Sequence, residues 1–157
     1  MSAQQIYDHA PLGSVVHYSD GTPRPPERHR KKLSAWENTN SGGRLIRKQA
    51  EQRVGNTTIL ASITLHEGDY GSRAAIVLRI FLSFSVDSEL KFIVTERPTI
   101  GSVRVFDRAG DDAELVHVAA NRPEAEDWLQ THGYPNAVLD EVDADDMAAD
   151  TVEGRAA

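Results

Sequence analysis

The stretch from residue 74 to residue 86, AAIVLRIFLSFSV, is the most apolar run in the chain and limits its fold more than any other segment. Its even-numbered positions are all apolar, whereas its odd-numbered positions include Arg79, Ser83 and Ser85. Apolar residues at every second position predict a β-strand with one buried face. A strand of roughly 13 residues would extend on the order of 40 Å, so we expect a bulge or bend within it. We interpret it as the central strand of a sheet.

Shorter segments with strand-like patterns lie on both sides of this run. Residues 57–66, TTILASITLH, alternate apolar with mostly hydroxylated side chains, which predicts the antiparallel neighbour of the central strand. Residues 67–73, EGDYGSR, hold two glycines and are expected to form the hairpin loop between these two strands. The middle connections are too short for crossover helices, so we expect an antiparallel meander. The other predicted strands are 13–18, 44–49, 90–96, 101–106, 113–119 and 137–142.

The first predicted helix spans about residues 26–38. His29, Leu33 and Trp36 recur at helical spacing and make a narrow apolar stripe, while basic residues occupy the other faces. The Gly-Gly pair at 42–43 is expected to end the helix. This pattern predicts a basic amphipathic helix that covers the sheet.

The second predicted helix lies within residues 121–133. Asn121 and Glu124 match a capping box, and a proline lies in the first turn, where its missing N–H costs nothing. A glycine follows at the C-terminal end and favours a stop there. We expect Trp128 and Leu129 to pack on the sheet.

Together these elements predict a single α+β domain over residues 13–142, in which an antiparallel meander of about five to seven strands is covered by two helices. Residues 1–12 are expected to form an N-terminal arm, and residues 143–157 a disordered acidic tail. The expected core residues are Val15, Leu33, Trp36, Ile59, Ile63, Leu65, Ile76, Leu78, Ile80, Leu82, Phe84, Phe92, Val94, Val103, Val105, Leu115, Trp128 and Leu129.

The composition excludes several classes of protein. The 157 residues include no cysteine, which rules out disulfides, thiolate metal sites and cysteine nucleophiles. There is no basic patch followed by an apolar core at the N-terminus, and no apolar segment long enough for a membrane span, so we expect a soluble cytoplasmic protein with no membrane partner. The usual glycine-rich dinucleotide, P-loop, serine-hydrolase and EF-hand motifs are absent, and no cofactor or metal is predicted.

The net charge of -7 is unevenly distributed along the chain. Residues 1–60 carry a charge of +4, and the remainder carries -11. Cations clustered in this way attract phosphates without reading sequence, and Tyr18 or Trp36 would offer stacking surfaces for bases. Two functional interpretations stay open beside that of a plain solvated helix face: DNA or RNA bound with low specificity, and an acidic protein partner. The candidate binding residues are Arg24, Arg28, Arg30, Lys31, Lys32, Arg44, Arg47 and Lys48.

A second candidate site is the sequence His66-Glu67 followed by Asp69 and Tyr70, because an imidazole beside carboxylates can act as an acid or a base. Neighbouring strand residues point to opposite faces, so His66 and Glu67 would converge only if the chain turns there. A non-enzymatic binding or regulatory protein is therefore favoured. A protein-interaction module and a hydrolase that uses His66, Glu67 and Asp69 remain as alternatives.

Overall fold

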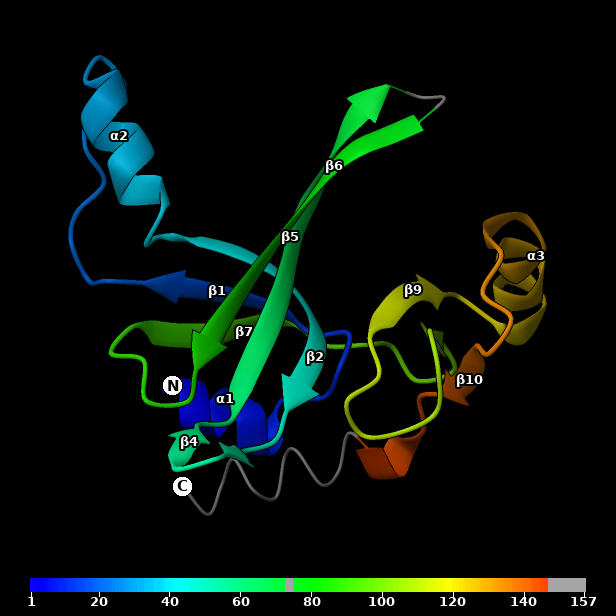
Figure 1. The fold of residues 1–157 in the computed structure, drawn as a ribbon. Helices are drawn as coiled ribbons and strands as arrows, with labels where there is room; N and C mark the ends of the chain where they lie inside the picture. The colour runs from blue at the N-terminus through cyan, green and yellow to red at the C-terminus, as the bar shows by residue number, and fades with distance from the viewer. Residues whose placement is uncertain (73–74, 147–157) are drawn as a thin grey trace.

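The long apolar run forms strand β6, Ala75–Ser85, which pairs antiparallel with β5, Ser62–Ser72. This computed structural model describes residues 1–72 and 75–146, apart from the side chains of residues 68–79. β6 lies at one edge of a five-stranded sheet whose order is β6-β5-β2-β1-β7 (Figure 1). The prediction of a strand is therefore confirmed, and its predicted place at the centre of the sheet is wrong.

The far half of the β5–β6 hairpin projects beyond the other strands (Figure 1). β2 pairs with β5 only from Ser62 to His66, whereas β6 follows β5 as far as Ser72. The register of β6 slips by one residue opposite Tyr70 and Gly71, so the expected bulge is confirmed. The loop predicted to start at residue 67 is wrong, because backbone hydrogen bonds to β6 keep the chain extended in spite of its glycines.

The other strands of this sheet are β1, Val15–Ser19, β2, Ser41–Gln49, and β7, Lys91–Glu96. β7 pairs with β1 at the opposite edge from β6, so the predicted meander is wrong. This pairing brings Phe92 into the core beside Tyr18, with ring centroids 6.3 Å apart. Burial of these aromatic rings is a physical reason for β7 to cross to the far edge.

The first residues of the chain form helix α1, Ala3–His9, which lies against the five-stranded sheet (Figure 1). Ser2 caps it, since its hydroxyl accepts from the backbone N–H of Gln5 and the Gln5 side chain accepts from the backbone N–H of Ser2. The segment predicted to be an arm thus supplies part of the core. The buried cluster under the sheet consists of Ala3, Ile6, Ala10, Val16, Tyr18, Leu45, Ile63, Leu65 and Phe92.

A second layer is a three-stranded antiparallel sheet in the order β10-β8-β9. It consists of β8, Val103–Phe106, β9, Leu115–Ala119, and β10, Val138–Glu141, all three of which were predicted. Helix α3, Arg122–His132, packs against this sheet. The predicted cap residues are confirmed: Asn121 accepts a hydrogen bond from the Glu124 backbone, and Gly133 ends the helix in a left-handed conformation. The predicted capping box is half formed, because the Glu124 carboxylate accepts from the backbone N–H of Ala120 and not from that of Asn121.

Helix α2, Arg30–Glu37, is shorter than predicted and buries none of its residues. It stands away from the sheets instead of covering one (Figure 1). The glycines at 42 and 43 do not end it, because they lie inside β2, where neighbouring chains approach closely. A Cβ on Gly43 would lie 2.7 Å from the carbonyl oxygen of His66. Glycine is therefore needed there for interstrand contact.

Residues 52–59, between the predicted strand 44–49 and the first half of the predicted strand 57–66, form a small hairpin. It consists of β3, Gln52–Val54, and β4, Thr57–Ile59. The single strand predicted over residues 57–66 is divided into β4 and β5. Ile59 is 53% exposed, so its predicted place in the core is wrong. The cause is that β3 and β4 pair only with each other, which leaves no sheet to cover them.

The α+β class with mainly antiparallel sheets is confirmed, with ten strands in three sheets among the described residues. Most of the predicted core is buried or half-buried, and the side chains of Ile76 and Leu78 lie outside the described residues. No helix in residues 1–72 and 75–146 is long and apolar enough to cross a membrane. Of the acidic tail, residues 143–146 are described and contact the domain, and residues 147–157 lie outside the description.

Candidate functional site

The site begins with an irregularity in β2. The pairing of β2 with β5 slips between Leu45 and Arg47, which leaves Ile46 as an extra residue. Leu45 faces the core, whereas Arg44, Ile46 and Arg47 line hollows on the opposite face of the sheet. The bulge therefore places two arginines close together on the face that meets the second sheet.

Three adjoining hollows form a groove between this face and β9. The central one, of about 290 Å³, shares Ile46 with one neighbour and Arg44 and Val118 with the other. Each neighbouring hollow has a volume of about 330 Å³. We call this region the inter-sheet groove. Its central hollow is lined by Arg44, Ile46, His66, Leu115, Val116, His117 and Val118.

Among the residues whose side chains are described, the lining of the central hollow includes cationic and titratable nitrogen groups and no carboxylate. Arg44 donates one hydrogen bond to the Gly13 carbonyl at 2.6 Å, which holds its guanidinium in place and leaves other N–H groups for a ligand. Burial lowers the pKa of His117, and the nearby charges of His132 and Arg44 add to the effect against an opposing contribution of Glu124. His117 is therefore a neutral imidazole at pH 7 and can donate or accept a hydrogen bond.

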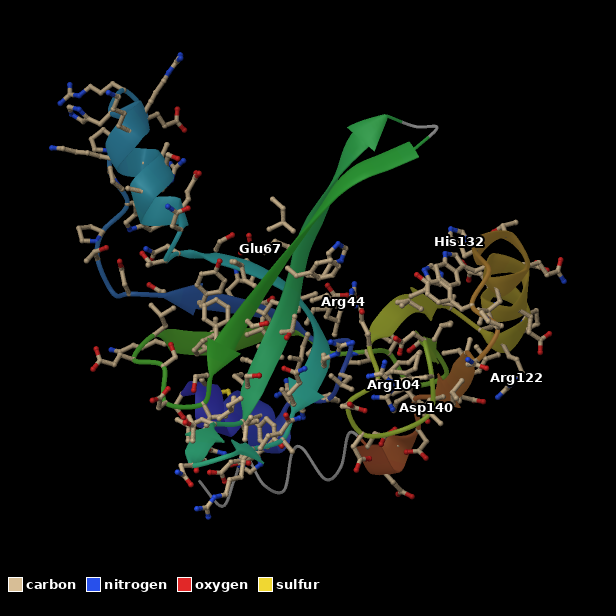
Figure 2. The ribbon with its side chains drawn as sticks, viewed as in Figure 1. Arg44, Glu67, Arg104, Arg122, His132 and Asp140 are labelled. Atoms are coloured by element: carbon tan, nitrogen blue, oxygen red, sulfur yellow. The ribbon has the colours of Figure 1, made fainter. Side chains whose placement is uncertain are left out.

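Flat rings border the groove on both sides. His66 lies beside Phe81, with ring centroids 5.2 Å apart, and Phe81 is 42% exposed. Across the groove, His117 stacks on Trp128 at 4.6 Å, with only 3° between the ring planes. Trp128 also stacks with His132, at 4.0 Å, and with Tyr134, at 5.6 Å; the labelled His132 lies on α3 (Figure 2). Such rings are surfaces on which a base or another planar group can stack.

The ends of the groove carry two more arginines. Arg47 forms an ion pair with Glu114 at 3.5 Å, which links β2 to the chain just before β9. Arg97 lines the other end, in the hollow that also contains Glu96 and Arg44. Both acidic residues thus lie at the ends of the groove, and cationic nitrogen groups follow its whole length.

The predicted basic set is divided by the fold. Its members from Arg24 to Lys32 lie on α2 and the segment before it, which projects from the sheet, and Arg24 pairs with Glu27 at 3.7 Å. Arg44 and Arg47 lie in the groove on the body of the molecule, and Lys48 lines a different cavity (Figure 2). The eight residues do not form one continuous surface.

The second predicted set is also separated. His66 lies in the groove, while Glu67 points to the opposite face and accepts a hydrogen bond from Tyr18. The side chains of Asp69 and Tyr70 lie outside the described residues. The expectation that His66 and Glu67 diverge on an extended chain is confirmed, and the loop that would have joined them is absent.

Sequence reasoning did not bring His66 and His117 together in one hollow. The two residues lie on strands of different sheets, and in the sequence His66 stands beside Glu67 while His117 stands between two valines. It also missed the contribution of Arg97. A local sequence pattern does not predict contacts between sheets. The residues that line the groove can therefore be identified only from the arrangement of the strands.

Arg104 lines the same cavity as Lys48, on the acidic side of the molecule. Its side chain is 9% exposed and pairs with Asp140 and, at 3.3 Å, with Asp146 (Figure 2). Asp146, in the first part of the predicted tail, therefore contacts Arg104. Within residues 1–72 and 75–146, no three acidic or histidine side chains are arranged to hold a metal ion.

Comparison with known proteins identifies the family. Residues 1–146 match the model of the family described as Uncharacterised conserved protein UCP036055, and the chain belongs to that family. No curated protein and no solved structure matches the chain. The family description names no activity, so the function has to be argued from the geometry of the groove.

Proposed function

We propose that this member of the UCP036055 family is a non-enzymatic protein that binds a single-stranded nucleic acid along the inter-sheet groove. The observation that carries the proposal is the central hollow, which combines Arg44 with two imidazoles and has no carboxylate in a chain of net charge -7. Acidic residues outnumber basic ones in the chain as a whole, so a hollow without them favours an anionic ligand.

The length of the groove favours a strand over a small anion. Arg47, Arg44 and Arg97 follow one another through three adjoining hollows, as successive phosphates would require. Phe81 and the imidazoles of His66 and His117 provide flat surfaces between them for bases. Cations that follow the backbone, combined with rings that stack on bases, are the usual means of binding single strands with low sequence preference.

The test is a fluorescence anisotropy titration with short labelled DNA and RNA single strands between about 50 and 200 mM salt. With three arginines near phosphates, the logarithm of affinity should fall with the logarithm of salt concentration with a slope of about -2. Arg44→Gln should weaken binding and make the slope shallower by about 0.7. Arg97→Gln is the second groove variant, because Arg44 also bonds to Gly13.

The matched control is Lys31→Gln, which removes one exposed positive charge from α2. If Lys31→Gln weakens binding as much as the groove variants do, α2 is the contact surface and the groove assignment is wrong. If inorganic phosphate or a mononucleotide binds and no oligonucleotide does, the ligand is a small anion. The absence of all such binding at low salt would favour an acidic protein partner.

A further inference from the structure

A further cavity, outside the groove and the Arg104 region, lies between α2 and the core face of the five-stranded sheet. It has a volume of about 630 Å³, within the range of small-molecule pockets. Among the residues whose side chains are described, its lining includes no lysine, arginine or histidine, although the neighbouring helix carries Arg30, Lys31 and Lys32. The charged groups in this described lining are the carboxylates of Glu37 and Glu67.

Glu67 is placed by a bulge in β5. The register against β6 slips between His66 and Gly68, which leaves Glu67 as the extra residue. Its carboxylate accepts a hydrogen bond from the Tyr18 hydroxyl, and Tyr18 in turn accepts one from Ser41. Burial, the bond to Glu67 and the charge of Glu67 raise the pKa of Tyr18 well above its ordinary value. Tyr18 is thus a neutral donor that orients the carboxylate in the cavity (Figure 2).

The aromatic residue Trp36 lines the same cavity and is held from outside it. Its indole N–H donates to the Thr22 carbonyl at 3.1 Å, and its own carbonyl accepts from the Asn40 side chain at 2.8 Å. Asp20 accepts from the Thr22 and Thr39 hydroxyls, and these bonds lower its pKa. The network fixes the C-terminal end of α2 on β1 and β2.

We propose that this cavity binds a small organic cation, a protonated or quaternary amine. A carboxylate and an aromatic ring on the walls of one cavity are the groups that attract an ammonium ion, through charge and through the face of the ring. Leu82 and Ile80 provide an apolar floor for the hydrocarbon part of such a ligand. The site is separate from the groove and lies on the opposite face of β5.

The test uses two-dimensional NMR of the full chain, because the chain has only two tryptophans and the two indole N–H signals can be assigned with one Trp128→Phe sample. Tetramethylammonium and putrescine are titrated against sodium chloride at matched ionic strength. Saturable shifts of the Trp36 indole signal and of the Glu67 and Tyr18 amides support the proposal. The titration itself is carried out on the unaltered protein, and the Trp128→Phe sample serves only to assign the indole signals.

Glu67→Gln should weaken amine binding at least tenfold, since the amide keeps the shape and loses the charge. Glu126→Gln removes the same charge from an exposed position on α3, outside the linings of the groove and of this cavity, and should leave amine binding unchanged. If sodium chloride produces the same shifts as the amines, or if both variants weaken binding equally, the shifts come from general ionic attraction and not from a specific amine site. The proposal then fails. Binding of a neutral sugar with no binding of amines would also overturn it.

Discussion

Substitution of the two adjacent glycines of β2 tests whether the close approach of β2 to β5 requires glycine at position 43. A Cβ added to Gly43 would lie 2.7 Å from the carbonyl oxygen and 2.9 Å from the carbonyl carbon of His66. Both are backbone atoms in the middle of the sheet, so β2 and β5 must separate to make room. A Cβ added to Gly42 would lie 2.8 Å from the ring of His17, an exposed side chain that can rotate away.

Gly43→Ala should lower the free energy of unfolding by about 3 kcal/mol, at the upper end of the range for overpacking, because the added carbon meets backbone atoms in a packed sheet. Gly42→Ala should cost about 1 kcal/mol or less, because alanine also reduces the conformational freedom of the unfolded chain. With an m-value of about 2 kcal/mol/M, Gly43→Ala should lower the urea midpoint by about 1.5 M and Gly42→Ala by at most about 0.5 M. Equal midpoints for the two variants would show that the contact with His66 does not constrain the sheet.

Three further predictions concern stability measured by urea unfolding. Ile6→Ala should lower the free energy of unfolding by about 3 kcal/mol because Ile6 is fully buried, whereas Ile59→Ala at an exposed position should change it by less than about 0.5 kcal/mol. The folded state lowers the pKa of His117, so the unfolded chain binds this proton more readily, and stability should fall as pH decreases through about 6.5; His117→Phe should reduce that dependence. Arg104→Ala should cost about 3 kcal/mol, and Arg104→Met about half as much, because methionine fills the space and leaves no charge to bury.

Local sequence patterns predicted the helices and strands better than they predicted which strands lie next to one another. The cap residues of α3 and the alternation in β5, β6 and β8 are local signals. α3, β6 and β8 lie within the residues predicted for them, and β5 begins within its predicted residues and extends beyond them. Helix α1 carries such signals too, in the capping box of Ser2 and Gln5 and in the spacing of Ala3, Ile6 and Ala10. Its short length made it look irregular in the sequence, and its stability comes from burial against the sheet.

Strand order depends on contacts that no local pattern reports. β7 follows β6 in the sequence and pairs with β1, where Phe92 joins the buried ring of Tyr18 and the half-buried ring of Phe84. The inter-sheet groove follows from that order, because β9 approaches β2 only after the chain has crossed the sheet. Sequence reasoning identified Arg44 and Arg47 as binding candidates and could not show that α2 lies elsewhere.

β5 connects the two proposed sites. His66 lies in the inter-sheet groove, and Glu67, the extra residue of the bulge, lies toward Tyr18 on the other face. This bulge falls where β5 leaves the cover of β2. Gly43 packs against the backbone of both residues, with its added Cβ 3.1 Å from the Glu67 nitrogen. A shift of β5 away from β2 would therefore move a groove imidazole and the cavity carboxylate together. The spacing between these two strands is thus the structural feature on which both binding surfaces depend.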